Sequence, residues 1–167
     1  MGVTMRVLVL GGDGFCGRPT SLYLSSRGHD VTIVDNLSRR KIDTDLEVGS
    51  LTPIAAVGDR LRAWREVSGR EIGFLCVDLA TEYDQLTAVL RDLRPDAIVH
   101  FAEQRAAPYS MRSEKTKRYT VDNNVRATHN LLAALVQTGV DARSRTSARW
   151  GCTATAGRGT RPSRRAT

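Results

Sequence analysis

The sequence predicts an α/β protein with a doubly wound parallel sheet, and three observations support this. A short apolar run, Met5–Leu10, leads into a glycine-rich turn that contains Gly11, Gly14 and Gly17. A helix-like segment follows, and a second apolar run, Val31–Asp35, ends on a carboxylate. Further apolar runs then alternate with segments of helical spacing. This alternation is typical of a Rossmann-like sheet that helices cover on both faces.

The expected elements follow in order along the chain. Strands are expected at residues 5–10, 31–35, 72–77 and 95–102, and helices at residues 15–27, 55–67, 83–93 and 116–137. The helix at 83–93 has the clearest pattern, because Leu86, Leu90 and Leu93 recur at helical spacing. In the helix at 55–67, Leu61, Trp64 and Val67 share one face. We expect the polar residues 36–41 to form a turn and residues 103–115 to form a loop.

The first turn and the end of the second strand together predict a dinucleotide site. Glycines let backbone N–H groups approach a pyrophosphate closely at the start of a helix. Asp35, eighteen residues after Gly17, is placed to accept hydrogen bonds from the hydroxyls of an adenosine ribose. Because its charge would repel a 2′-phosphate, we favour NAD as the cofactor. Arg39 and Arg40 leave the alternative open, since arginines at this place also accept a 2′-phosphate.

Other polar residues are expected at the same edge of the sheet. Asp78 follows the third strand and is interpreted either as an adenine contact or as a helix N-cap. Arg105, after the fourth strand, is either a clamp for an oxyanion or a solvated loop residue. Asn124 either holds backbone groups or a cofactor hydroxyl, or lies on an exposed polar face. The predicted cofactor-binding residues are Gly11, Asp13, Gly14, Phe15, Cys16, Gly17, Asp35, Asn36, Ser38, Arg39, Arg40, Asp78, Leu79, Phe101, Ala102, Gln104 and Asn124, and the predicted substrate-binding residues are Gln104, Arg105 and Tyr109.

Composition separates residues 1–141, the expected dinucleotide-binding domain, from residues 142–167. The chain has 25 basic and 18 acidic residues, and seven arginines with no acidic residue lie after position 142. Without those seven the charges are equal, so the basic excess does not indicate a nucleic-acid-binding domain. Residues 142–167 carry almost no large apolar side chains, and we expect a disordered basic tail and a sheet truncated after about four strands.

Three cysteines without metal-ligand spacing and the lack of an 18-residue apolar run fit a cytoplasmic protein with no metal and no membrane span.

These residues resemble the extended short-chain dehydrogenase/reductase family, which includes NAD-dependent epimerases and dehydratases, and within it the UDP-sulfoquinovose synthases. The resemblance covers about residues 5–141. It is carried by Gly11–Gly17, Ile33–Arg40, Ser50–Ile54, His100–Met111 and Asn123–Val125. It implies that NAD takes a hydride from C4 of UDP-glucose, that water leaves C6 and sulfite adds, and that the hydride then returns. A UDP-sugar and sulfite are the implied partners, and the resemblance allows a homodimer of the intact enzyme.

The resemblance also implies a catalytic threonine and a Tyr-x-x-x-Lys motif, but no Tyr follows Tyr119 and no Lys follows Lys117. We therefore expect no catalytic residue in this chain. Codons that encode residues 144–156 can also be read in the adjacent reading frame. With suitable synonymous choices, that frame encodes a peptide similar to the family's next strand and loop. This suggests a frameshift near codon 142. Two alternatives are another nucleotide-sugar epimerase or dehydratase, and a non-catalytic dinucleotide-binding protein with a basic interaction tail.

Overall fold

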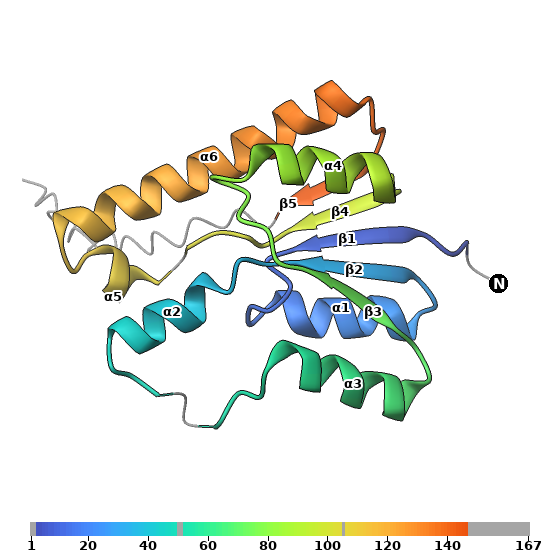
Figure 1. Ribbon diagram of the computed structural model, residues 1–167, viewed down its shortest axis with the longest axis horizontal. Helices are drawn as coiled ribbons and strands as arrows, with labels where there is room; N and C mark the ends of the chain where they lie inside the picture. The colour runs from blue at the N-terminus through green and yellow to red at the C-terminus, as the bar shows by residue number, and fades with distance from the viewer. Residues whose placement is uncertain (1–2, 50–51, 105, 147–167) are drawn as a thin grey trace, which may run out of the picture.

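Five parallel strands form the sheet, and the chain enters it at the central strand. The computed structural model describes residues 3–49, 52–104 and 106–146 (Figure 1). The strands, in spatial order, are β3 (Ile72–Leu75), β2 (Asp30–Val34), β1 (Arg6–Leu10), β4 (Ala97–His100) and β5 (Arg143–Thr146). The chain runs outward from β1 to β3 and then crosses back to β4 on the other side of β1. The carboxyl ends of β1 and β4 therefore flank the switch point, where ligands bind in open parallel sheets.

Helices cover both faces of this sheet. They are α1 (Gly17–Ser26), α2 (Ser38–Asp45), α3 (Val57–Ser68), α4 (Tyr83–Leu93), α5 (Ala107–Ser110) and α6 (Glu114–Thr138). Figure 1 shows α1 and α3 on one face and α4 and α6 on the other. Among the described residues, no helix combines the length and the apolar character needed to cross a membrane.

The central strand explains why both faces are covered, because its side chains alternate between two apolar cores. Val7 and Val9 belong to the core that contains Leu22 of α1 and Trp64 of α3. Leu8 and Leu10 belong to the other core, with the leucines of α4 and with Leu131 of α6. All four β1 side chains are buried. Four consecutive apolar side chains in a strand need cover on both faces, so the pattern of β1 after Arg6 favours the three-layer arrangement.

The long helix α6 begins two residues earlier than the apolar pattern predicts, because its start is defined by polar side chains. The hydroxyl of Ser113 accepts a hydrogen bond from the N–H of Thr116, and the Thr116 hydroxyl accepts one from the N–H of Ser113. This reciprocal capping box satisfies two otherwise unpaired donors. The helix ends at Gly139, whose φ of 61° is the left-handed conformation that favours glycine.

A fifth strand follows the four expected ones, at the start of the segment expected to be a disordered tail from residue 142. Residues 143–146 pair in parallel with β4, with Arg143 opposite Ala97, and the N–H of Arg143 donates to the carbonyl of Asp96. Apolar periodicity did not reveal this strand, because backbone groups at the open edge of β4 define it. Residues 147–167 lie outside the described part of the chain.

Two smaller expectations were wrong. Residues 36–41 do not form a simple turn, because the helix α2 starts at Ser38. This helix buries none of its residues, so it lacks the apolar spacing that would predict it. Val67 does not share the packed face of α3 with Leu61 and Trp64, since its side chain is 85% exposed near the end of the helix.

Candidate dinucleotide site

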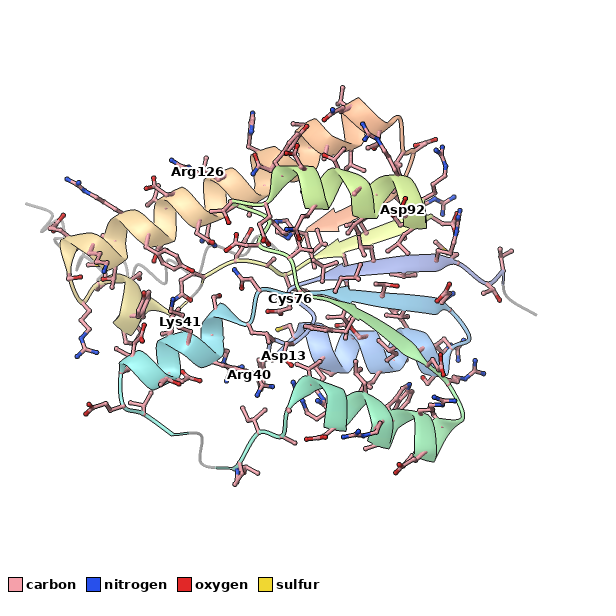
Figure 2. All side chains as sticks on the ribbon, in the orientation of Figure 1. Asp13, Arg40, Lys41, Cys76, Asp92 and Arg126 are labelled. Atoms are coloured by element: carbon pink, nitrogen blue, oxygen red, sulfur yellow. The ribbon has the colours of Figure 1, made fainter. Side chains whose placement is uncertain are left out.

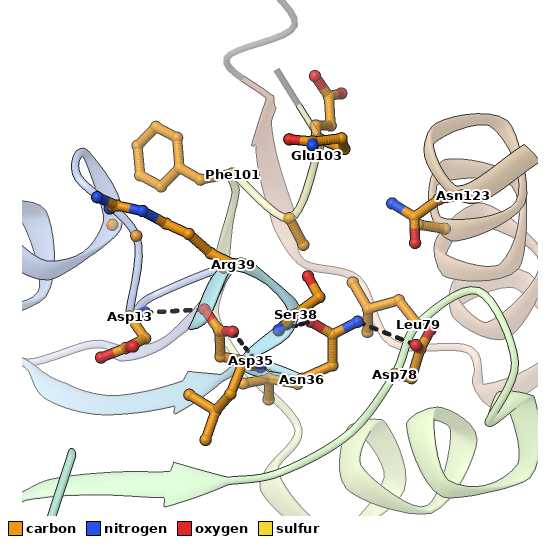
Figure 3. Close-up of a pocket in the computed structure, with 18 of the residues that line it drawn as sticks. Asp13, Asp35, Asn36, Ser38, Arg39, Asp78, Leu79, Phe101, Glu103 and Asn123 are labelled. Atoms are coloured by element: carbon orange, nitrogen blue, oxygen red, sulfur yellow. Dashed lines mark hydrogen bonds between the residues drawn. The ribbon is translucent and has the colours of Figure 1, made fainter. Parts of the chain in front are cut away.

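A pocket of about 480 Å³ opens at the carboxyl ends of the strands, where the topology places the switch point (Figure 3). Its volume lies in the range typical of small-molecule sites. The glycine turn, the start of α2 and the segments after β3 and β4 surround it. Fourteen residues predicted to bind the cofactor alone line it: Gly11, Asp13, Gly14, Phe15, Cys16, Gly17, Asp35, Asn36, Ser38, Arg39, Asp78, Leu79, Phe101 and Ala102. Gln104, predicted for both roles, lines it too.

Glycine is favoured at each of the three positions of the turn for a different physical reason. Gly11 has a φ of 76°, and a Cβ there would lie 2.6 Å from the backbone nitrogen of Ala102. A Cβ on Gly17 would overlap the carbonyl oxygen of Gly11, so glycine allows α1 to start close to β1. At Gly14, a Cβ would meet only the Gly11 oxygen, at 3.2 Å. Compared with Gly11 and Gly17, packing therefore opposes a side chain less strongly at Gly14. Its missing side chain instead opens the pocket toward the start of α1, which fits the close approach of a pyrophosphate.

Asp35 lies at the end of β2, where its carboxylate joins the second strand to the glycine turn. It accepts hydrogen bonds from the N–H of Asp13 at 2.9 Å and from the N–H of Leu37 at 2.7 Å (Figure 3). Burial raises the pKa of Asp35, while the Leu37 N–H and the charge of Arg40 act in the opposite direction. Each oxygen accepts one backbone hydrogen bond and keeps further lone pairs. The carboxylate is thus fixed in orientation beside the pocket, as a ribose-binding acid requires.

Asp13 and Arg40 contact each other, which sequence reasoning did not foresee. The Asp13 carboxylate accepts from Arg40 Nε at 2.9 Å and also forms an ion pair with Arg60 of α3. Arg40 donates in addition to the carbonyl of Ala55 at 3.2 Å. Arg40 does not line the pocket, whereas its neighbour Arg39 does. Arg40 thus contacts the glycine turn, and its expected contact with the cofactor stays a prediction.

Asp78, which follows β3, lines another part of the pocket. Its carboxylate accepts from Asn36 Nδ2 at 2.9 Å and from the N–H of Ala80 at 2.9 Å. The N-cap of α4 is Glu82, so the alternative reading of Asp78 as the cap of that helix is wrong. Together, Asp78 and Asn36 join the segment after β3 to the segment after β2. This pairing fixes the spacing between the two strand ends that flank the pocket.

The segment after β4 is held by α6. Asn124 is buried, and its side chain accepts from the N–H of Gln104 at 2.8 Å and donates to the carbonyl of Gln104 at 3.0 Å. The prediction that Asn124 holds backbone groups is therefore confirmed. The alternative, that it lies on an exposed polar face of the helix, is wrong. Asn124 supports Gln104 and is absent from the pocket lining, and its expected contact with the cofactor stays a prediction. Gln104 Nε2 is buried without a hydrogen-bond partner among the described residues, and such a donor favours a ligand acceptor.

His100, the last residue of β4, is buried beneath this segment. Its Nδ1 accepts from the N–H of Ala102 at 3.3 Å, and its Nε2 lies 3.3 Å from the hydroxyl of Thr128. Burial lowers the pKa of His100 to about 4. The ring is therefore neutral at pH 7, as a hydrogen-bonded core histidine should be.

The other two predicted substrate residues are Tyr109 and Arg105. Tyr109 of α5 packs edge-to-face against Tyr119 of α6, with ring centroids 6.1 Å apart, and is absent from the pocket lining. Arg105 lies outside the described residues. Within the described part of the chain, no group of three or more His, Cys, Asp or Glu residues could hold a metal ion.

Sequence reasoning missed several residues that line the pocket. They are Val34, Leu37, Ile42, Asp43, Val77, Ala80, Glu103, Ala106, Asn123 and Ala127. Val34 and Val77 precede the predicted acids Asp35 and Asp78, so their place beside the strand ends was a usable signal. Ile42 and Asp43 depend on the helical form of α2, which the sequence pattern did not show.

Comparisons with known proteins agree with this geometry. The sequence model of the NAD dependent epimerase/dehydratase family matches residues 7–167. The match continues past residue 141, where we expected the resemblance to stop. The chain is 45% identical over 130 residues to the chloroplastic UDP-sulfoquinovose synthase of Spinacia oleracea. It is 40% identical over 133 residues to the UDP-sulfoquinovose synthase of Sulfolobus acidocaldarius. These alignments cover 78% and 80% of the chain but only 27% and 34% of the two synthases.

Among solved structures, the UDP-glucose 4-epimerase of Stenotrophomonas maltophila, with bound NAD and formylated UDP-arabinopyranose, is similar at 26% identity. The TM-score is 0.62, and the match covers 81% of this chain and 34% of the epimerase. The fold, the pocket at the switch point and the match over residues 7–167 lead to one conclusion: the chain belongs to the NAD dependent epimerase/dehydratase family.

Proposed function

We propose that the chain forms the NAD-binding part of a UDP-sulfoquinovose synthase, an enzyme that converts UDP-glucose and sulfite to UDP-sulfoquinovose for sulfolipid synthesis. The observation that carries this proposal is the identity of 45% and 40% with two such synthases, in a chain whose pocket has the parts of a dinucleotide site. The chain spans about a third or less of the length of those relatives. The substrates and the reaction are therefore proposed for the longer enzyme.

The residues of the pocket suggest how NAD is oriented. The pyrophosphate lies against the glycine turn and the first N–H groups of α1, where the helix dipole favours negative charge. The Asp35 carboxylate accepts from the ribose hydroxyls, and Asp78 and Leu79 border the adenine. The nicotinamide then extends toward Phe101 and Ala102, at the carboxyl end of β4. When bound, NAD supplies the reversible removal of a hydride from the sugar.

The segment after β4 is the proposed meeting place of nicotinamide and sugar. Gln104 contributes a buried amide donor there, and Asn124 fixes the backbone that carries it. Glu103 lines the same part of the pocket. The tyrosine, lysine and threonine that the family uses for proton transfer do not match residues of this sequence. We therefore propose that these 167 residues bind NAD without turning it over.

The proposal is tested with the enzyme produced from the complete coding region, read through to the family's Tyr-x-x-x-Lys motif. UDP-glucose is supplied with and without sulfite, and the products are identified by mass spectrometry. A UDP-sugar that carries a sulfonate and forms only with sulfite would support the synthase. Formation of UDP-galactose, independent of sulfite, would overturn it in favour of an epimerase, the activity named for the solved neighbour.

A further inference from the structure

Asp13 connects three elements around the glycine turn. Its N–H donates to the Asp35 carboxylate at the end of β2. Its own carboxylate accepts from Arg40 of α2, with Nε at 2.9 Å and an Nη at 3.4 Å, and forms an ion pair with Arg60 of α3. Figure 2 shows Asp13 and Arg40 side by side next to the turn. One residue therefore contacts both the ribose-binding acid and two cations.

The two cations are held away from the bulk solvent. The side chains of Asp13 and Arg60 are 11% and 13% exposed, and that of Arg40 is 31% exposed. Arg60 Nε is buried without a hydrogen-bond partner among the described residues. Burial lowers the pKa of Arg60, and burial together with the charge of Arg40 lowers the pKa of Arg18. One carboxylate is thus shared by two guanidinium groups in a region that already has excess positive charge.

This arrangement bears on the choice between NAD and NADP. A 2′-phosphate on the adenosine ribose would lie beside Asp35 and would need a cation to offset its charge. Arg39 of α2 lines the pocket and is one candidate for this cation. Its neighbour Arg40, which acts electrostatically on Asp35, is the other. Its guanidinium is instead directed to Asp13 by two hydrogen bonds.

We propose that Asp13 is a specificity-determining residue that disfavours NADP by holding Arg40 and Arg60 away from the 2′ position of the ribose. Asp35 repels the 2′-phosphate directly, and Asp13 holds two cations that would otherwise add to the charge of Arg39 in offsetting this repulsion. The inference rests on the proposed NAD site and adds to it a second carboxylate with a separate role.

The test compares the dissociation constants of NAD and NADP for the full 167-residue chain by isothermal titration calorimetry. In Asp13→Asn the two arginines lose their shared counter-ion. The ratio of the NADP to the NAD dissociation constant is expected to fall at least about tenfold, the order expected for one charge at ~10 Å in an effective dielectric of ~20. Adding Arg40→Gln to this variant should restore most of the original ratio, because the improved binding of NADP depends on the Arg40 guanidinium.

Two further variants serve as a control for the loss of a paired carboxylate and as a substitute if Asp13→Asn does not fold. Asp59→Asn removes another carboxylate paired with an arginine, Arg62, but on the exposed side of α3, and it should leave the ratio unchanged. If Asp13→Asn does not fold, Asp13→Asn with Arg60→Gln leaves one unpaired guanidinium instead of two, and the ratio should shift in the same direction.

The outcomes separate the two hypotheses. A wild-type chain that is folded and binds neither dinucleotide overturns the proposed function, and this inference with it. A wild-type chain that binds NAD, together with Asp13 variants whose ratio equals that of Asp59→Asn, overturns the role of Asp13 alone.

Discussion

Replacement of Asn124 by alanine tests how far the site depends on α6. In the structure, this buried side chain makes two hydrogen bonds to the backbone of Gln104, at 2.8 and 3.0 Å, and accepts a third from Asn123 Nδ2 at 3.2 Å. The Asn124→Ala variant leaves the Gln104 N–H and carbonyl without these partners. It also removes a side-chain link between α6 and the segment after β4 that lines the pocket.

The expected loss of stability follows from those two backbone groups. A buried donor or acceptor left without a partner costs roughly 1–3 kcal/mol. Gln104 is only half-buried, so water can replace part of the lost bonding, and alanine is favoured over asparagine in a helix by roughly 0.5 kcal/mol. We therefore expect the free energy of unfolding to fall by about 2 kcal/mol, with a Tm lower by roughly 5–8 °C.

Chemical denaturation followed by circular dichroism measures this change. The matched control is Asn123→Ala, which removes the same type of side chain from the neighbouring position of α6 but no contact to Gln104. Its free energy of unfolding should stay within about 0.5 kcal/mol of the wild-type value. If Asn124→Ala is as stable as Asn123→Ala, the reasoning about Gln104 is refuted.

Three further predictions concern the glycine turn, the buried histidine and the gene. Gly17→Ala should weaken NAD binding at least about tenfold in a titration, because its Cβ would overlap the Gly11 carbonyl and displace the start of α1; unchanged affinity would contradict the packing argument. Burial lowers the pKa of His100 to about 4, so the unfolded chain takes up a proton first as pH falls, and stability should be lost from about pH 6.5 to about pH 4. His100→Gln should flatten that part of a stability-against-pH curve, and an equal slope in both proteins would exclude the effect. Finally, DNA sequencing beyond codon 142 should show that the adjacent reading frame stays open and encodes Tyr-x-x-x-Lys, whereas an early stop codon there would contradict a frameshift.

Much of the fold could be predicted because apolar side chains define it. The leucines of α4 and the continuous apolar run of β1 have spacings that only a helix and a strand with two covered faces satisfy. The helix α2 and the strand β5 could not be predicted in this way. Polar contacts such as that of Arg40 with Asp13 hold the first, and the backbone edge of β4 defines the second.

In the candidate site, too, some features could be predicted from the sequence and others could not. The positions of Gly14, Asp35 and Asp78 follow from strand ends and turn chemistry, so they could be predicted to meet at one edge of the sheet. The partners of polar side chains could not. Whether Asp13 faces a cofactor or two arginines, and whether Asn124 faces solvent or Gln104, depends on distances between elements that are far apart in the sequence.

The central claim is that the glycine turn and Asp35 together bind the adenosine diphosphate portion of NAD. Isothermal titration of NAD into the folded chain tests it most directly. The account predicts saturable binding with one NAD per chain. A chain whose circular dichroism shows a folded α/β protein, yet which gives no heat of binding at millimolar NAD, would contradict it.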